Sequence, residues 1–314
     1  MESIDRNKQF EGVSGWWNSK TPERYDNQHN DDCDVHAKRV FSSREKKVLQ
    51  FVDDLHLPKG AKVLELGYGP GFTALQLGKR GLEIHGVDIS ATFCEIATRR
   101  CTEGCPEGEF FFRVGNIENN LGYEDNSFDL VLLVGVFHYL YSDDSCLQEV
   151  YRVLKPGGHL IVCQRKTYGL AHLTSFRVFM RSCIYFLFSE KYEVFPSFKA
   201  MLCDTKLGLI FGRYQESKWM NTKMMLKNHD VWKFKLKKKL YTGRRLCKSF
   251  ERNGLSPIRV GGAYFCFSIK PKYYDFNIKL DDFLVKIFEK KYLGFLSWFT
   301  WMAVVVSQKD ANRK

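Results

Sequence analysis

An acid and three closely spaced glycines stand together in the segment LELGYGPG. Glu65 precedes Gly67, and Gly69 and Gly71 follow in a GxGxG spacing. Glycines at this density let the backbone approach a ligand closely. The sequence lacks the Gly-Lys-Ser/Thr of a phosphate loop, and Phe72 occupies the place of the last glycine in the dinucleotide fingerprint. A carboxylate such as Glu65 repels a diphosphate but orients a cationic or amino-bearing group. The loop therefore favours a ligand with a positive group and no diphosphate.

A second acid, Asp88, ends the next apolar run in GVDIS, about 20 residues after the glycines. A carboxylate at the end of the second strand of such a unit can accept hydrogen bonds from both hydroxyls of a ribose. The two acids together indicate a ligand that carries a ribose and a positive group.

Apolar runs alternate with amphipathic stretches around these residues. The pattern predicts strands at 61–66, 83–88, 109–114, 128–134 and 158–164, and helices at 35–56, 71–80, 90–101 and 143–154. KPGG (155–158) is interpreted as the turn into the fifth strand. Apolar strands separated by helices indicate parallel β-α-β units, with a sheet covered on both faces. The glycine loop and Asp88 then follow neighbouring parallel strands at one edge of that sheet.

The alternation breaks after residue 165 and returns near residue 241. The chain is accordingly divided into an N-terminal segment (1–34), a ligand-binding core (35–165), an insertion (166–240) and a C-terminal completion of the core (241–314). In the last segment the sequence predicts a helix at 242–253, strand material at 256–269, a helix at 281–290 and a final strand at 301–307.

Four segments resemble the motifs of class I S-adenosylmethionine-dependent methyltransferases of the small-molecule type. They are LELGYGPG, GVDIS (86–90), VGNIENNLGYEDNSFDLVLLVGVFHYL (114–140) and EVYRVLKPGGHLIV (149–162). The resemblance implies an α/β fold with a doubly wound, mostly parallel seven-stranded sheet, helices on both faces and an antiparallel last strand. It also implies S-adenosyl-L-methionine as the cofactor, with 166–240 as an inserted α-rich lid over the substrate.

The resemblance also assigns roles to individual residues. Those assigned to cofactor binding are Tyr25, Glu65, Gly67, Tyr68, Gly69, Gly71, Asp88, Ile89, Asn116, Ile117, Val134 and Gly135. Asn116 departs from the acid that the family often has there, although its amide oxygen can still accept a hydrogen bond from the adenine amine. GWWNSKTPERYD resembles a segment that closes over the cofactor, with Tyr25 near the methionine carboxylate. Alternatively, Trp16 and Trp17 anchor the N-terminal helix.

Methyl transfer is an in-line displacement, so the protein must mainly align the reactants and exclude water. A general base is needed only where the acceptor has a proton to lose. His138, just past the fourth strand, is the catalytic candidate; alternatively, it only shapes the pocket. Tyr139, Tyr141, Tyr168 and His172 are secondary candidates, for each of which a packing role is the preferred interpretation. No metal is expected.

The net charge is +12, and the basic excess is concentrated at 218–248. This favours an anionic partner, such as a peripheral contact with an anionic membrane surface or RNA. The apolar runs are shorter than a membrane span, and MESIDRNKQF does not resemble a signal peptide. The ten scattered cysteines are therefore expected as free thiols in a cytoplasmic protein, for which a peripheral location at a membrane is the open alternative.

The acceptor is expected to be a small, apolar or amphipathic molecule. LTSFRVFMRSCIYFLF (173–188) places apolar residues at helical spacing, as a pocket-capping helix would, and KFKLKKKL (233–240) alternates lysines with apolar residues. An RNA acceptor and a non-catalytic scaffold are the alternatives. No RNA-binding module and no NPPY-type tetrapeptide is present, while the acids and glycines that bind the cofactor are intact.

Overall fold

The computed structural model describes residues 6–18, 35–165, 219–221, 237–239, 243–263 and 302–310, together with the single positions 276, 279 and 283. Several predictions lie outside these residues. They are the placements of Tyr25, Tyr168 and His172, nearly all of the insertion at 166–240, and the helix at 281–290.

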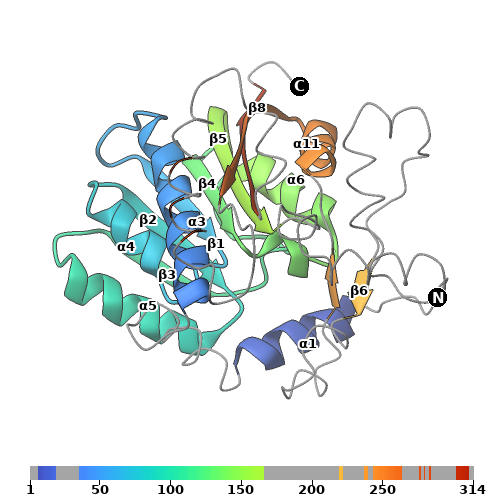
Figure 1. Ribbon diagram of the computed structural model, residues 1–314, viewed down its shortest axis with the longest axis horizontal. Coiled ribbons are helices and arrows are strands. Elements are labelled where there is room, and N and C mark those ends of the chain that lie inside the picture. The colour runs from blue at the N-terminus through green and yellow to red at the C-terminus, as the bar shows by residue number, and fades with distance from the viewer. Residues whose placement is uncertain are drawn as a thin grey trace.

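Seven strands form one central sheet (Figure 1). In chain order they are β1 (Lys62–Leu66), β2 (Glu83–Asp88), β3 (Phe110–Val114), β4 (Phe128–Val134), β5 (Leu154–Arg165), β8 (Leu255–Ala263) and β9 (Met302–Lys309). The spatial order is β3-β2-β1-β4-β5-β9-β8, and β9 is antiparallel to both of its neighbours. The predicted fold class is confirmed, including the antiparallel last strand.

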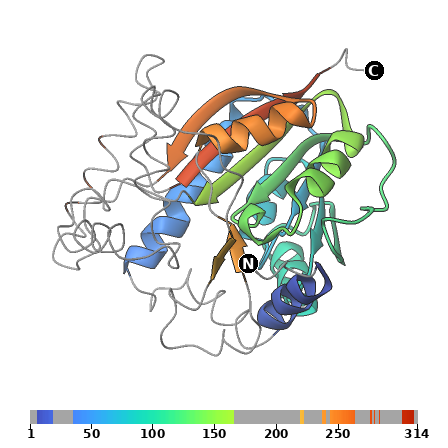
Figure 2. The same cartoon turned by 90° about the vertical axis from the view of Figure 1, so that its right-hand side faces the viewer.

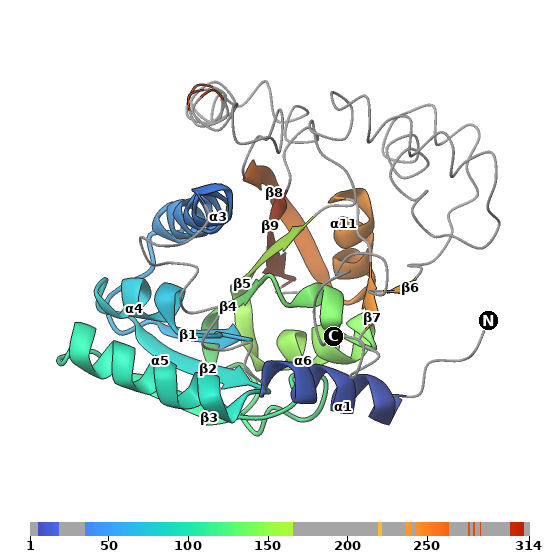
Figure 3. The same cartoon turned by 60° about the horizontal axis from the view of Figure 1, so that its bottom comes forward.

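Helices cover both faces of this sheet (Figure 3). On one face are α3 (Val35–Asp53), α4 (Phe72–Gly78) and α5 (Ala91–Gly104); on the other are α6 (Asp143–Val153) and α11 (Gly243–Arg252). Phe51 and Leu77 pack in one core cluster, whereas Leu147 and Phe250 pack in the other. Because β1 and β4 contribute apolar side chains to both clusters, their sequences read as continuous apolar runs.

The C-terminal elements complete the sheet beside β5. Figure 2 shows β9 between β5 and β8, with α11 packed against the last two strands. A two-stranded ribbon, β6 (Trp219–Asn221) with β7 (Lys237–Lys239), stands apart from the main sheet. Within the described ranges, no helix has the length and apolarity to cross a bilayer.

The interpretation of KPGG as a turn before the fifth strand is wrong. Strand β5 already begins at Leu154, which pairs with Phe128, and pairing resumes at His159 opposite Leu130. The intervening residues form an irregularity in the ladder, with Gly157 at a φ of 76°. The extra residues are accommodated as a bulge, which the left-handed conformation of glycine permits.

Candidate functional site

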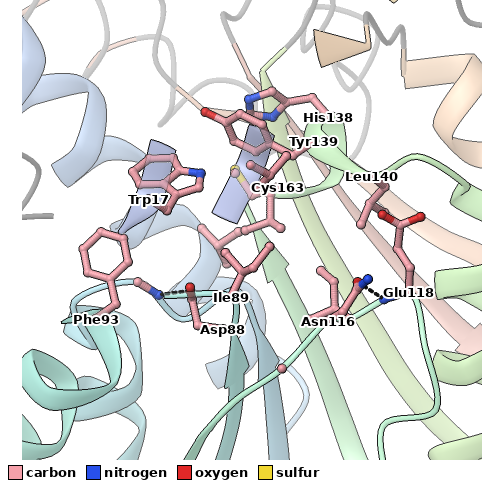
Figure 4. Close-up of a pocket in the computed structure, with 18 of the residues that line it drawn as sticks. Trp17, Asp88, Ile89, Phe93, Asn116, Glu118, His138, Tyr139, Leu140 and Cys163 are labelled. Atoms are coloured by element: carbon pink, nitrogen blue, oxygen red, sulfur yellow. Dashed lines mark hydrogen bonds between the residues drawn. The ribbon is translucent and has the colours of Figure 1, made fainter. Parts of the chain in front are cut away.

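A cavity of about 520 Å³ opens where β1, β2 and β4 end (Figure 4). It gathers most of the residues expected to bind the cofactor: Gly67, Gly69, Asp88, Ile89, Asn116, Ile117, Val134 and Gly135. The catalytic candidate His138 lines the same cavity. Carboxyl ends of parallel strands meet at one edge of a sheet, which is why residues so far apart in sequence converge here.

The glycine loop follows β1 and has a conformation that other residues rarely adopt. Gly67 has a φ of 75°, and a Cβ there would lie 2.3 Å from Cγ2 of Val136. Gly69 has a φ of 54°, but a Cβ there would meet no atom of the described residues within 4 Å. The backbone at Gly69 thus borders open space in which a ligand can approach.

Gly71 has a different place from the one expected. It is the left-handed residue before α4, and a Cβ there would lie 2.9 Å from that of Ala97 on α5. It lines neither the cavity nor the smaller pocket beside it. A glycine is required at position 71 because α4 and α5 approach each other too closely there for a side chain.

Asp88, at the end of β2, is buried and bound to backbone N–H groups. Its Oδ2 accepts from the Gly69 N–H and its Oδ1 from the Ser90 N–H, both at 2.9 Å. Burial raises the pKa of Asp88 to about 6, and these backbone hydrogen bonds limit the rise. Each carboxylate oxygen has a second lone pair, so the side chain can still accept hydrogen bonds from a ligand.

Glu65, two residues before the glycine loop, lies in a small pocket beside the cavity together with Arg44 of α3. Its Oε2 is buried and has no hydrogen-bond partner among the described residues. Burial raises the pKa of Glu65 to about 8, although the Arg44 guanidinium lowers it. Tyr68 lines this small pocket as well and packs against Phe112, with ring centroids 4.6 Å apart and ring planes tilted by 42°.

Asn116 follows β3, and its amide oxygen, which was expected to accept a hydrogen bond from the adenine amine, is bound within the protein. Its Oδ1 accepts a hydrogen bond from the Glu118 N–H at 2.9 Å, as Figure 4 shows. This bond assigns the amide orientation, since a backbone N–H needs an acceptor. The Nδ2 group is then a donor, which suits a ring nitrogen of an adenine better than its exocyclic amine.

His138 lies on the short helix η2 (Phe137–Tyr139) after β4, across the cavity from Asp88 in Figure 4. Its ring packs against Tyr139 with centroids 4.0 Å apart. The Nδ1 atom lies 3.1–3.2 Å from the side-chain amide of Gln164. Cys163, Val136 and Met302 also line the cavity and give it an apolar wall.

Helix α1 (Arg6–Trp17) covers the cavity. Gln9 donates to the Tyr139 carbonyl at 3.1 Å, and Asn18 Oδ1 accepts from the Ala91 N–H at 3.0 Å. Trp17 packs between Phe93 and Tyr139, with ring centroids 5.6 and 5.8 Å away. The tryptophan therefore anchors the helix and lines the cavity at once.

Comparisons with known proteins agree with this geometry. Residues 64–162 match the family model described as "Methyltransferase domain". This region of the chain is a methyltransferase domain. It contains all four motifs on which the resemblance was based, so the resemblance to class I S-adenosylmethionine-dependent methyltransferases is confirmed.

Curated relatives match little more than a third of this chain. A "Demethylmenaquinone methyltransferase" of Tropheryma whipplei (strain Twist) is 31% identical over 131 residues, which are 38% of this chain and 53% of that protein. The enzyme of the same name from Lactiplantibacillus plantarum is 34% identical over 115 residues, 36% of this chain and 48% of that protein. The chain thus spans about half the length of these relatives.

Solved structures share the fold over nearly the whole chain. Magnesium protoporphyrin IX methyltransferase from Synechocystis PCC 6803, solved with bound S-adenosylhomocysteine (SAH), has a TM-score of 0.56 at 15% identity and covers 96% of this chain and 100% of that one. A geranyl diphosphate methyltransferase has a TM-score of 0.55 at 14% identity and covers 96% and 98%. At this identity the likeness establishes the fold alone.

Sequence reasoning missed several residues of the methyltransferase domain's site and its surroundings. Arg44 comes from α3, well before the glycine loop, and reaches both the cavity and the small pocket. Glu118 accepts from the Tyr141 and Ser142 N–H groups at 2.9 and 2.8 Å and so holds the loop after η2. Gln164 is the last residue of the strand predicted at 158–164, with no feature that marks it. None of these positions carries a local motif.

Proposed function

We propose that this protein is an S-adenosylmethionine-dependent methyltransferase that acts on a small, apolar or amphipathic acceptor. The observation that carries the proposal is the convergence of Glu65, Gly69 and Asp88 at the carboxyl ends of neighbouring strands. Oε2 of Glu65, buried and without a hydrogen-bond partner in the described part of the chain, suits an ammonium group, and the space beside Gly69 suits the chain that carries it. These features fit the methionine part of the cofactor.

The remaining residues fit the other parts of the cofactor. Asp88 would accept hydrogen bonds from the ribose hydroxyls, and the Asn116 amide would donate to the adenine. Ile89 and Ile117 line the cavity near them and would pack on the adenine faces. Arg44 supplies the positive charge that the methionine carboxylate requires in a buried site.

The acceptor is placed in the apolar part of the cavity. Phe41, Val136 and Met302 line it there, and none offers charge or a hydrogen-bonding side chain. The relatives named for demethylmenaquinone support an acceptor of this apolar, small-molecule class.

The chain's own contribution to the reaction is alignment and the exclusion of water. S-adenosylmethionine, when bound, supplies an activated methyl group on a good leaving group. The glycine loop, Asp88 and Asn116 fix the orientation of the cofactor. Helix α1, held to the loops around the cavity by Gln9 and Asn18, keeps water from it.

The test is calorimetric binding of SAH, followed by turnover of S-adenosylmethionine. We expect Asp88→Ala to abolish measurable binding. Asp129→Ala is the matched control, because Asp129 also accepts a backbone N–H, that of Lys62 at 2.9 Å, at the opposite end of the sheet. Equal binding by the wild type and Asp88→Ala, or no binding by the wild type, would refute the proposal.

The other expectations concerning partners stay predictions. The basic stretch at 218–248 lies largely outside the described residues, and the segment at 173–188, predicted to be an apolar helix, lies entirely outside them. We propose a cytoplasmic protein that contacts anionic membrane surfaces, which vesicle flotation with and without phosphatidylserine would test. Retention on phosphatidylserine-free vesicles alone, or on neither, would argue against it.

A further inference from the structure

A glutamine is buried where the neighbouring residues of its strand are apolar. Gln164 is 2% exposed and stands near the end of β5, after Leu160, Ile161, Val162 and Cys163, which are fully buried. Burying a primary amide is costly unless it is hydrogen-bonded. The amide of Gln164 lies beside Nδ1 of His138, a residue that lines the cavity. The Gln164 amide therefore contacts a residue that lines the site.

The contact between Gln164 and His138 has two chemically different forms. The distances from Nδ1 are 3.2 Å to Oε1 and 3.1 Å to Nε2 of the glutamine, so either atom can face the ring. If the amide oxygen faces it, Nδ1 carries the proton and the Nε2 atom of His138 is the acceptor. If the amide nitrogen faces it, these roles are reversed.

Only the first form survives protonation of the ring. An imidazolium carries a proton on both nitrogens, so an N–H donor opposite Nδ1 would have to turn away. An oxygen opposite Nδ1 accepts the same hydrogen bond before and after the ring gains a proton. Tyr139 also restricts the His138 side chain, because its ring packs against the imidazole and limits rotation of the imidazole.

We propose that Gln164 holds His138 in the tautomer with its proton on Nδ1, so that Nε2 accepts a proton from the methyl acceptor. The acceptor is then a hydroxyl compound or a molecule with an acidic C–H group. This inference rests on the proposed function and narrows its substrate class. The acceptor gives its proton to Nε2, and the electron pair left behind forms the bond to the methyl carbon. The C–S pair departs with sulfur, so the positive charge passes from the sulfonium to the imidazolium. Gln164 is a positioning residue in this scheme.

The first test replaces Gln164 by residues of similar size. Glutamate can only accept a hydrogen bond from Nδ1–H, whereas methionine can make no such bond. We expect Gln164→Met to lower kcat about 10-fold or more with little change in KM, and Gln164→Glu to rescue most of that loss. A merely structural role predicts the opposite order, since a buried core accepts Met far better than Glu. That opposite order would overturn the proposal.

The second test reads the tautomer without any turnover. Side-chain ¹⁵N spectra of the SAH complex, assigned by comparison with His138→Gln, report which nitrogen of His138 carries the proton. We expect the proton on Nδ1 in the wild type and in Gln164→Glu, and loss of that preference in Gln164→Met. A wild-type ring protonated on Nε2 instead would overturn the proposal.

The third test addresses the acceptor class with two probes of matched size, 2-naphthol and isoquinoline. The first has a hydroxyl and an acidified carbon; the second has a nitrogen with no proton to lose. We expect turnover of 2-naphthol, reduced about 100-fold or more in His138→Gln with unchanged affinity for SAH. Turnover of isoquinoline in preference, or an undiminished rate in His138→Gln, would overturn this inference but not the proposed function. Loss of SAH binding by the wild type would instead overturn the proposed function.

Discussion

Oδ2 of Asp88 accepts a hydrogen bond from the backbone N–H of Gly69 at 2.9 Å. This bond joins the end of β2 to the glycine loop after β1, so the groups proposed to bind the ribose and the methionine chain form one unit. The backbone N–H of the glycine loop also affects the pKa of the Asp88 carboxyl. Burial raises the pKa of Asp88 to about 6, and the backbone N–H groups of Gly69 and Ser90 keep it from rising further.

Binding of adenosine compounds should therefore weaken in acid. A carboxylate accepts hydrogen bonds from both ribose hydroxyls, whereas its protonated form gives up part of that capacity. Because the pKa in the folded protein lies above the ordinary value of 3.8, ionisation destabilises the free protein as pH rises through that window, and the ligand offsets this cost. We expect the affinity for 5′-methylthioadenosine to be constant above about pH 7 and to fall below pH 6.

Calorimetry between pH 5 and 8 measures this dependence. Asp88→Asn is the control, since an amide at this position does not titrate; we expect weaker binding, by about 10-fold or more, with a flat profile. A flat profile for the wild type would show that Asp88 is not the group that recognises the ribose.

A methyl group at Gly69 should damage binding more than folding. Gly60 and Gly69 both have a positive φ, and a Cβ at either would meet nothing within 4 Å. Alanine at each position should thus cost a similar backbone strain, about 1–2 kcal/mol. Only Gly69 borders the cavity, so only Gly69→Ala places a methyl group where the ligand lies.

Urea unfolding and SAH calorimetry on both variants separate the two effects. We expect comparable losses of unfolding free energy but a loss of affinity of about 10-fold or more in Gly69→Ala alone. Unimpaired binding by Gly69→Ala would place the ligand elsewhere.

Binding of a ligand with an amino-acid end should release a proton from Glu65. Burial raises the pKa of this carboxyl to about 8, so it is mostly protonated at pH 7 in the free protein. An adjacent ammonium stabilises the carboxylate and lowers the pKa, so the proton leaves on binding. Affinity for SAH should accordingly rise between pH 6 and pH 8.

Calorimetry at pH 7 in phosphate and in Tris, which differ in ionisation enthalpy, measures the protons released. 5′-Methylthioadenosine lacks the amino-acid end and should release none from Glu65, and Glu65→Gln should abolish the release for SAH. Equal heats for SAH in the two buffers would contradict a role for Glu65 in binding the ammonium.

The fold and most of the site could be predicted from the sequence, because local apolar patterns predict the strands and the order of strands and helices predicts how the strands pair. Glu65 and Asp88 end two successive apolar runs, and parallel pairing brings such ends to one edge of the sheet. Arg44 could not be found in this way, because its place depends on how α3 packs against the sheet. Nothing in the sequence specifies that angle.

Gln164 and the bulge at Gly157 illustrate the same limit. A single polar residue near the end of an apolar strand gives no sign of its partner, and its relation to His138 depends on the register between β4 and β5. That register is set by the bulge, which the sequence presents as an ordinary turn motif. Tertiary pairing here overrides the local signal of KPGG.

Helix α1 should control how fast the ligand leaves. Two of the side chains that fix it to the loops around the cavity are Gln9, which donates to the Tyr139 carbonyl, and Asn18, whose Oδ1 accepts from the Ala91 N–H. Each such hydrogen bond contributes about 0.5–1.5 kcal/mol net. The double variant Gln9→Ala/Asn18→Ala should therefore speed dissociation of SAH about 10-fold or more, while the association rate changes less because entry already requires the helix to move.

Stopped-flow fluorescence can follow this step, since Trp17 lines the cavity and should report the ligand directly. Glu11→Ala is the matched control, because Glu11 is an exposed residue of the same helix. An equal dissociation rate in the double variant and in this control would mean that α1 does not retain the ligand. Faster dissociation in both the double variant and Glu11→Ala would mean instead that the stability of the helix, rather than the hydrogen bonds of Gln9 and Asn18, limits release of the ligand. Only a selective effect of Gln9 and Asn18 supports a helix that closes the site through the loops that bind the adenosine.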